Sequence, residues 1–273
     1  MIILYVILGI IALISISYIV SISPGRPRRH LLKPFMNTYI AHRGFFNNRA
    51  IPENSLLSFK AAVERGYAIE LDVQLTSDGE MVVFHDNTLK RMCNVKKRVS
   101  DCTYDELCTY RLLATDCMIP HFSDVLSLVD GKVPLLIEVK PHGDVMGTTK
   151  ELERMLRTYK GVYAVQSFHP SVCSFYKKYR PEVPRGLLST HYKKDKLKKG
   201  FPISFIMTNL LLNFTVKPDF IAYNHKYADQ PSLRLMRKLY KTPCAAWTLR
   251  SPEELKKAKD GFDMFIFDSF EPR

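Results

Sequence analysis

The sequence predicts an α/β protein built as a (β/α)₈ TIM barrel, with a small insertion after the second strand and one transmembrane helix in front. Three observations support this prediction: an uncharged apolar stretch at the amino terminus, eight later apolar runs that alternate with helical segments, and a tight turn directly after the second run. An open doubly wound sheet produces the same alternation, so periodicity alone leaves both architectures open.

The composition is that of a folded domain with an excess of positive charge. The 273 residues contain 12 Gly, 16 Pro and 6 Cys and are 46% hydrophobic, which excludes collagen-like, broadly disordered and small disulfide-stapled proteins. The 40 Lys and Arg against 27 Asp and Glu give a net charge of +13, which favours anionic partners. Because no zinc finger, RNA-recognition signature or basic heptad region accompanies this charge, we expect no nucleic-acid partner. The composition does not specify an oligomeric state.

The first 22 residues form an apolar stretch without a charged side chain. About 20 apolar residues suffice to cross the hydrocarbon core of a bilayer as a helix. A cleaved signal peptide would instead have Lys or Arg before a shorter apolar stretch and a small-residue cleavage site after it, and this sequence has neither. We therefore expect residues 1–22 to be a retained transmembrane anchor.

Residues 23–36 predict a basic, proline-containing linker, with Arg26, Arg28, Arg29 and Lys33 close behind the apolar stretch. By the positive-inside rule, these cations place the following domain on the cytoplasmic side of the cell membrane, in a single-pass protein. The six cysteines agree with this compartment, because they lack a C-x-x-C zinc spacing and remain thiols in a reducing cytosol.

Eight short apolar runs, rich in β-branched residues, provide the strands of a barrel domain that we expect to span residues 37–273. Segments with helical spacing of apolar residues separate them. The runs are 37–42, 67–75, 133–139, 163–168, 185–189, 220–224, 243–248 and 263–268.

Two of the intervening helices have clear ends in the sequence. Asn54 is the expected N-cap of a helix that Gly66 closes. Ser251 and Glu254 have capping-box spacing around a proline at the first helical position, which predicts another helix start.

The second run is followed by a turn that is too short for a parallel crossover. Residues 77–80 lead directly into the apolar run 81–86, whereas a parallel connection needs a dozen or more residues. We therefore expect 81–86 to return antiparallel as an additional strand, with residues 87–120 forming an inserted subdomain.

A two-residue turn at Asp78-Gly79 would place His85 opposite Asp72, with Glu70 on the same face of the strand. Neighbouring carboxylates repel each other unless a positive charge lies between them, and a divalent cation with oxygen ligands supplies one. The apolar residues that alternate with these carboxylates indicate that the other face of the strand is covered, which argues against a solvated strand edge.

The first and third runs also end in chemically active side chains. His42 ends the first run and Arg43 follows it, and Glu138 and Lys140 lie at the end of the third. Because the carboxyl ends of barrel strands share one face, we expect these residues to converge with the acidic pair of the second run. Carboxylates for a metal, histidines for proton transfer and cations for an anion suit phosphoester hydrolysis better than acyl or hydride transfer.

Five sequence blocks in this order resemble the glycerophosphodiester phosphodiesterase family. The blocks are AHRG (41–44), PENS (52–55), ELDVQLTSDG (70–79), VVFHD (82–86) and IEVK (137–140). The resemblance implies a TIM barrel with a small insertion after the second strand, and hydrolysis of glycerophosphodiesters to glycerol 3-phosphate and an alcohol.

The resemblance also implies a role for each matching residue. Glu70, Asp72 and Glu138 are the expected ligands of Mg²⁺ or Ca²⁺. His42 and His85 are the general acid and base, and Arg43 and Lys140 hold the phosphate. Glu53 orients Arg43 or helps the metal, and Trp247 lines the pocket.

The chain departs from the family pattern at three positions. Ser55 replaces a common threonine, which is a mild change that keeps the hydroxyl. Arg250 stands where asparagine is frequent and Phe267 precedes Asp268 where threonine is common, and these changes at the later strands bear on substrate preference. The alternative to a soluble glycerophosphodiester as substrate is a membrane lipid or lysolipid, which a related barrel phospholipase would cleave.

Five lysines precede a second apolar stretch at residues 201–214. A solvated loop before an ordinary barrel helix explains this pattern, and a second contact with the membrane is the alternative. The lysines are Lys193, Lys194, Lys196, Lys198 and Lys199.

Overall fold

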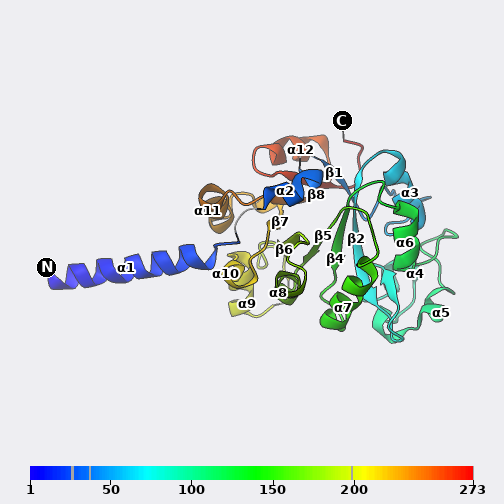
Figure 1. Ribbon diagram of the computed structural model, residues 1–273, viewed down its shortest axis with the longest axis horizontal. Coiled ribbons are helices and arrows are strands. Elements are labelled where there is room, and N and C mark those ends of the chain that lie inside the picture. Colours follow the sequence, from blue (N-terminus) through cyan, green and yellow to red (C-terminus); the bar gives the residue numbers. More distant parts are fainter. Residues whose placement is uncertain (26–27, 37, 198, 273) are drawn as a thin grey trace.

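The computed structural model describes residues 1–25, 28–36, 38–197 and 199–272. Arg26, Asn37 and Lys198, which the sequence analysis placed in the linker, the first strand and the lysine cluster, lie outside the described residues, as does the carboxyl-terminal Arg273. Figure 1 shows a barrel from which one long helix, α1 (Ile2–Ser21), projects away from the rest of the protein.

Eight parallel strands close into a barrel, which confirms the predicted fold class and excludes the open sheet. The order around the sheet is β1-β9-β8-β7-β6-β5-β4-β2, and pairing between β1 and β2 closes it. Each predicted run contributes one strand. The strands are β1 (Tyr39–His42), β2 (Ala68–Leu75), β4 (Leu135–Val139), β5 (Tyr163–Ser167), β6 (Arg185–Ser189), β7 (Phe220–Asn224), β8 (Cys244–Leu249) and β9 (Met264–Phe267).

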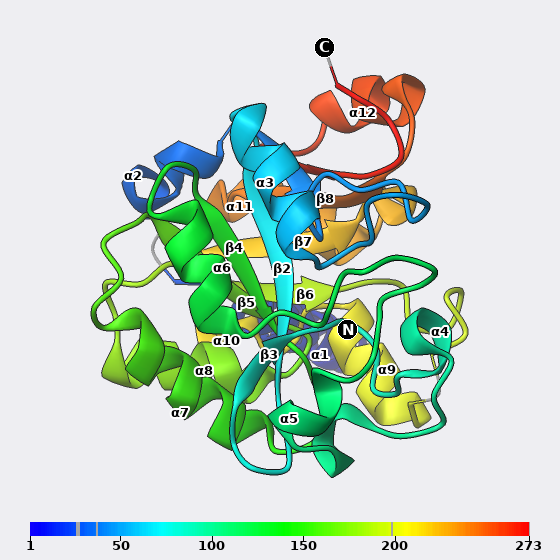
Figure 2. The same ribbon diagram turned by 90° about the vertical axis from the view of Figure 1, so that its right-hand side faces the viewer.

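Helices surround the barrel and connect its strands (Figure 2). The helices after α1 are α2 (Arg29–Leu32), α3 (Leu56–Glu64), α4 (Lys90–Cys93), α5 (Tyr104–Leu107), α6 (Phe122–Val129), α7 (Val145–Leu156), α8 (Pro170–Tyr179), α9 (Phe201–Thr208), α10 (Asn213–Val216), α11 (Pro231–Tyr240) and α12 (Pro252–Lys259). Short 3₁₀ turns occupy Lys33–Phe35, Val99–Asp101 and His225–Tyr227.

The cap of α12 is as predicted, but the cap of α3 lies one residue later than predicted. Ser251 Oγ accepts a hydrogen bond from the Glu254 amide at the start of α12. At α3, Ser55 is the N-cap and exchanges side-chain hydrogen bonds with Ser58. Asn54 cannot cap, because its backbone is in the left-handed region and its side chain binds Asp72 instead.

The antiparallel return after β2 is confirmed as β3 (Met81–Val83), but its predicted register is wrong by one residue. Val73 pairs with Val83, so Asp72 lies opposite Phe84, whose amide donates to the Asp72 carbonyl, and not opposite His85. The turn contains three residues between Thr76 and Glu80, with Gly79 at a φ of +84°. This is the three-residue loop with a left-handed third position, which shifts the pairing relative to a two-residue turn.

The segment between β3 and α6 forms the predicted insertion with a small core of its own. Phe84 and Leu89 pack there with Met92, Val99 and Leu107, all of them almost completely buried. The four cysteines of this region are thiols, as are the other two cysteines of the chain.

The segment after α1 is packed against the barrel. Leu32 and Phe35 are buried among Ile40, Leu136 and Phe220, at the end of the barrel where the strands begin. Arg28 reinforces this attachment through two hydrogen bonds of 2.6 and 2.7 Å to the buried carboxylate of Asp219. The amino-terminal end of the barrel is therefore plugged, which leaves the opposite end for chemistry.

Candidate active site

Chemically active side chains gather at the carboxyl ends of the first three parallel strands. In the closed sheet His42 of β1 pairs with Glu70 of β2, and Asp72 pairs with Glu138 of β4. Alternation along each strand places these side chains on the inner face, above the apolar layer that contacts the plug. They line or adjoin a cavity of about 160 Å³.

The carboxylates of Glu70, Asp72 and Glu138 form a compact buried cluster. One oxygen from each lies within 4.8 Å of the others, and all three residues are at most 6% exposed. Burial, reinforced by the negative charges of its two neighbours, raises the pKa of Glu70 well above its usual value. Asp72 Oδ1 is buried without a hydrogen-bond partner among the described residues, and its ion-pair contact with Lys140 Nζ is long, at 3.4 Å. An oxygen-rich, electrostatically strained cluster with an unsatisfied atom fits a hard divalent cation.

Two cations compensate part of this charge. Lys140 Nζ lies 2.7 Å from Glu138 and 3.4 Å from Asp72, and Arg43 Nε lies 3.4 Å from Asp72. Burial would raise the pKa of Asp72, but the positive charges around it hold that pKa below its usual value. When all three carboxylates are ionised, two cations leave the site net negative, and a further cation relieves the repulsion that raises the pKa of Glu70.

Arg43 is held in place by both its backbone and its side chain. Its backbone has a φ of 55° and its amide donates to Glu70, while its Nη1 donates to Glu53 at 2.6 Å. The next residue must be glycine, because a Cβ on Gly44 would lie 2.5 Å from Ser58 Oγ at a φ of +80°. Glu53 therefore contacts Arg43, and it is not part of the acidic cluster.

His42 is paired with a carboxylate at the end of the last strand. Its Nδ1 lies 2.9 Å from Asp268 Oδ2, so this hydrogen bond directs Nε2 away from Asp268. Burial and the positive charge of Arg43 lower the pKa of His42 to about 4, although Asp268 acts in the opposite direction. The imidazole is therefore neutral at pH 7 and held in one orientation.

His85 has an equivalent carboxylate partner in the neighbouring residue. Its Nδ1 lies 2.7 Å from Asp86 Oδ1. Arg91 of α4 donates to Asp86 and, through both terminal nitrogens, to Glu53. The insertion thus links the carboxylate beside His85 to the carboxylate that binds Arg43.

The remaining wall of the cavity is aromatic and apolar. Trp247 of β8 packs edge-to-face on Phe168, with ring centroids 5.7 Å apart, and both line the cavity with Leu188. Arg250 lies at the rim, where its Nε donates to Asp268. Every residue predicted for the site except Glu53 and Asp72 is among the cavity-lining residues, and those two contact lining residues directly.

Sequence analysis missed three supporting residues. Asp268 is the final residue of the last run, and that position at a strand end is a signal that could have identified it. Asp86 is adjacent to His85 in the VVFHD block. Arg91 has no sequence signal, because its role depends on how the insertion folds back onto the barrel.

Comparison with known proteins agrees with this arrangement. The sequence profile of the glycerophosphoryl diester phosphodiesterase family matches residues 42–271. A glycerophosphodiester phosphodiesterase of Bacillus altitudinis is 31% identical over 181 residues, which cover 61% of this chain and 73% of the relative. Lysophospholipase D GDPD1 of Rattus norvegicus is 30% identical over 139 residues, which cover 46% of this chain and 43% of the relative.

A solved structure shares the fold. The phosphodiesterase of Oleispira antarctica, in complex with the product sn-glycerol-3-phosphate, superposes with a TM-score of 0.69 at 21% identity, covering 87% of this chain and 94% of the other. The family profile extends from His42 in β1 to Glu271 after β9, and the chain therefore belongs to the glycerophosphoryl diester phosphodiesterase family of enzymes.

Proposed function

We propose that this protein hydrolyses glycerophosphodiesters to glycerol 3-phosphate and an alcohol, using a divalent cation and two histidines. The observation that carries the proposal is the buried cluster of Glu70, Asp72 and Glu138 at the cavity that His42 and His85 also line. Membership of the family supports the reaction class.

The acidic cluster would hold the cation, which is Mg²⁺ or Ca²⁺ in this proposal because all its protein ligands are carboxylate oxygens. When bound, the cation neutralises charge on the phosphoryl oxygens. Arg43 and Lys140 add fixed positive charge beside the cluster, where burial makes each charge more effective.

The two histidines would move the protons of the reaction. One takes a proton from the attacking oxygen and the other gives one to the departing alcohol. The Asp268 and Asp86 carboxylates each bind the Nδ1 side of a ring, which keeps Nε2 available for the substrate. The attacking oxygen is either a water or the neighbouring hydroxyl of the glycerol, and these side chains can serve both.

A membrane lysolipid is the second candidate substrate. Two observations favour it: α1 is long and apolar enough to cross a bilayer, and a lysophospholipase D is among the relatives. We propose that residues 1–22 anchor the enzyme in the cell membrane, that 23–36 connect the anchor, and that the catalytic domain (37–273) faces the cytoplasm. The basic residues after α1 support this orientation.

A substrate panel tests the reaction. Purified full-length enzyme in lipid nanodiscs is expected to release glycerol 3-phosphate from soluble glycerophosphodiesters when Mg²⁺ or Ca²⁺ is present. Release of lysophosphatidate from lysophospholipids, without turnover of the soluble diesters, would favour the lipid substrate. No product from either class with any divalent cation would contradict the proposed activity.

Asp268 provides a prediction about positioning. Asp268→Asn is expected to lower kcat roughly 10²-fold with little change in KM, because His42 loses the carboxylate that fixes its tautomer. Since Asp268 raises the pKa of His42, the limb of the kcat/KM profile that His42 controls should also move to lower pH. Ser269→Ala is the matched control, because it removes only a hydroxyl that donates to Asp268. An unchanged kcat and pH profile in Asp268→Asn would show that the contact is structural.

A further inference from the structure

The end of α1 is attached directly to the barrel. The Asn213 side chain of α10 donates to the Ile22 carbonyl at 3.1 Å, and the Tyr240 hydroxyl of α11 donates to the Ile19 carbonyl at 2.8 Å. Ile22 itself is completely buried. The end of α1 is therefore held directly against α10 and α11, from which point the helix projects away from the barrel (Figure 1).

The length of α1 determines what this attachment means at a membrane. Its 20 residues span about 30 Å, which matches the hydrocarbon thickness of a bilayer. A helix of this length has no turns to spare outside the hydrocarbon core. If α1 spans the bilayer, as proposed above, the barrel surface around its end must lie against the lipid headgroups.

That surface has an unusual share of exposed apolar side chains. After α1, eleven large hydrophobic residues of the described chain are exposed, and six of them lie in the segment from Leu197 to Leu239. On α9, Phe201 is 81% exposed, and Ile203 and Phe205 are each about half exposed. Phe201 stacks on Phe205 with their centroids 6.1 Å apart. Exposed Phe side chains are typical of the apolar face of helices that lie in the interfacial layer of a membrane.

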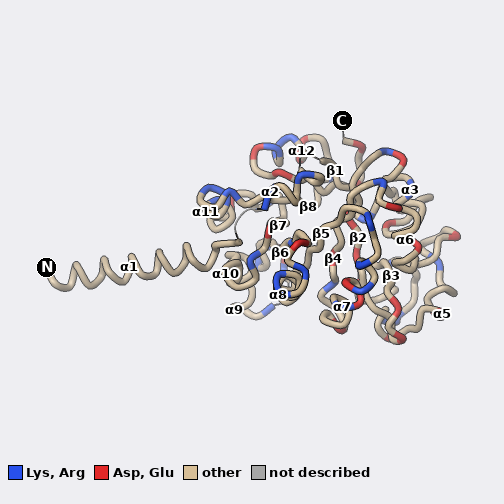
Figure 3. Tube along the Cα trace, in the orientation of Figure 1, with Lys and Arg blue, Asp and Glu red and all other residues tan. Residues whose placement is uncertain are grey.

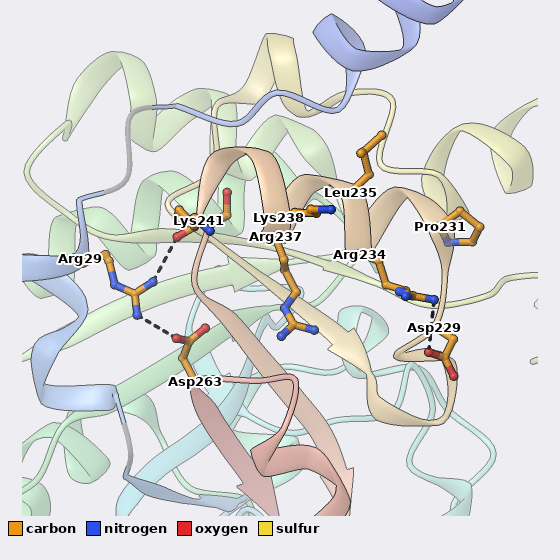
Figure 4. A pocket seen from close by; sticks show the side chains of 10 residues that line it. Arg29, Asp229, Pro231, Arg234, Leu235, Arg237, Lys238, Lys241 and Asp263 are labelled. Carbon is orange, nitrogen blue, oxygen red and sulfur yellow. Dashed lines mark hydrogen bonds and ion pairs between the residues drawn. The ribbon is translucent and has the colours of Figure 1, made fainter.

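The same surface is strongly basic on the side of α11. A cavity of about 660 Å³ lies between α11 and Arg29, and its lining includes Arg234, Arg237, Lys238 and Lys241 (Figure 4). The two lining acids are already engaged, since Asp263 binds Arg29 and Asp229 lies 3.9 Å from Arg234. Lys238 and Lys241 have no acidic partner among the described residues.

Charged residues are unevenly distributed over the described chain. Figure 3 shows Lys and Arg concentrated on the elements near the exit of α1, whereas acidic residues are more frequent toward the α3 and α5 end. Exposed lysines of the β6–α9 loop, Lys193, Lys194, Lys196 and Lys199, lie directly before the apolar residues of α9. A cationic surface with exposed aromatic side chains is complementary to an anionic headgroup layer over hydrocarbon.

We propose that α9 and α11 form a second membrane contact, in which the apolar residues of α9 enter the interface and the cations of α11 bind anionic lipid headgroups. We call this surface, defined by Phe201, Ile203, Phe205, Arg234, Lys238 and Lys241, the docking face. This proposal rests on the proposed anchoring of α1. The docking face holds the barrel in one orientation on the cytoplasmic leaflet. This proposal takes up the membrane-contact alternative for residues 193–214 in place of the solvated loop.

Tryptophan fluorescence in vesicles tests insertion of α9. The full-length protein is reconstituted into vesicles of phosphatidylcholine with phosphatidylserine, containing brominated acyl chains as quenchers. Phe205→Trp is expected to lose more than about half of its added emission, because an interfacial helix buries its apolar face about 5–10 Å deep. Leu57→Trp on α3, at the far end of the molecule, is the matched control and should not be quenched (Figure 2).

Charge variants test the contribution of α11. Arg234→Gln with Lys238→Gln, in the Phe205→Trp background, is expected to weaken docking about fivefold for each cation removed, as judged from quenching. High salt should have the same effect on the parent protein. Lys60→Gln with Lys96→Gln removes two exposed cations elsewhere and should change nothing. Equal quenching in both double variants would overturn the role of α11.

Extraction of the same vesicles with alkaline carbonate separates this proposal from the anchoring on which it rests. Protein that resists extraction but shows no quenching of Phe205→Trp would overturn the docking face and leave the anchor standing. Protein that is released would overturn the anchor, and quenching before release would then still support the docking face as a peripheral contact. Activity toward glycerophosphodiesters is measured separately and decides neither point.

Discussion

Removal of divalent cations is expected to lower the turnover of glycerophosphodiesters at least about 10³-fold, since a metal contributes several kcal/mol to charge stabilisation in such reactions. Glu70, Asp72 and Glu138 are buried within 4.8 Å of one another, and Arg43 and Lys140 do not balance their charge. Dialysis against a chelator followed by addition of Mg²⁺ or Ca²⁺ should abolish and then restore activity.

Thermal unfolding gives a second measurement that does not depend on turnover. A cation that binds only the folded protein at 100 times its Kd should stabilise it by about 2.7 kcal/mol. Glu70→Gln should abolish this stabilisation. The same variant should raise the stability of the cation-free protein, because the raised pKa of Glu70 shows that its charged form is unfavourable there.

The matched control for the metal experiments is Glu64→Gln, which replaces an exposed carboxylate of α3 outside the cavity. It should retain both activity and cation-dependent stabilisation. Full activity after exhaustive chelation, or equal stabilisation of Glu70→Gln and the parent protein by Mg²⁺ and Ca²⁺, would contradict the metal assignment.

The strand ends of this site could be predicted because barrel geometry is strongly reflected in local sequence. Glu70 and Asp72 each follow an apolar neighbour in β2, so alternation alone places them on one face, and Glu138 near the end of β4 joins them through the parallel pairing with Asp72. Asp268 was not predicted as a partner of His42, because 226 residues separate them and only closure of β9 against β1 brings them together.

The hairpin shows why register is harder to predict than the strand itself. Asp78-Gly79 fits a two-residue turn, and it also fits the last two positions of the three-residue loop that forms. His85 still reaches the cavity, because β3 ends at Val83 and strand alternation no longer decides where the next side chains point. The expectation that His85 lies at the cavity was therefore derived from an incorrect hairpin register.

Replacement of either histidine is the second prediction with a large effect. His42→Ala and His85→Ala are each expected to lower kcat about 10²–10⁴-fold, the usual contribution of a positioned proton-transfer group. The protein should remain folded, because neither ring belongs to the apolar core. His30→Ala, which removes an exposed imidazole of α2, is the control and should retain full activity.

A change of leaving group distinguishes the acid from the base. An alcohol needs a proton when it departs, whereas a nitrophenolate leaves without one, so a nitrophenyl diester should restore turnover only in the variant that lacks the general acid. The variant that lacks the base should stay impaired with both substrates. Because both residues act in one reaction sequence, the double variant should lose less than the product of the single effects. If the nitrophenyl ester rescues both variants equally, or rescues neither, the division of roles between His42 and His85 is wrong. Nearly full activity of either single variant with the natural alcohol would remove that histidine from the mechanism.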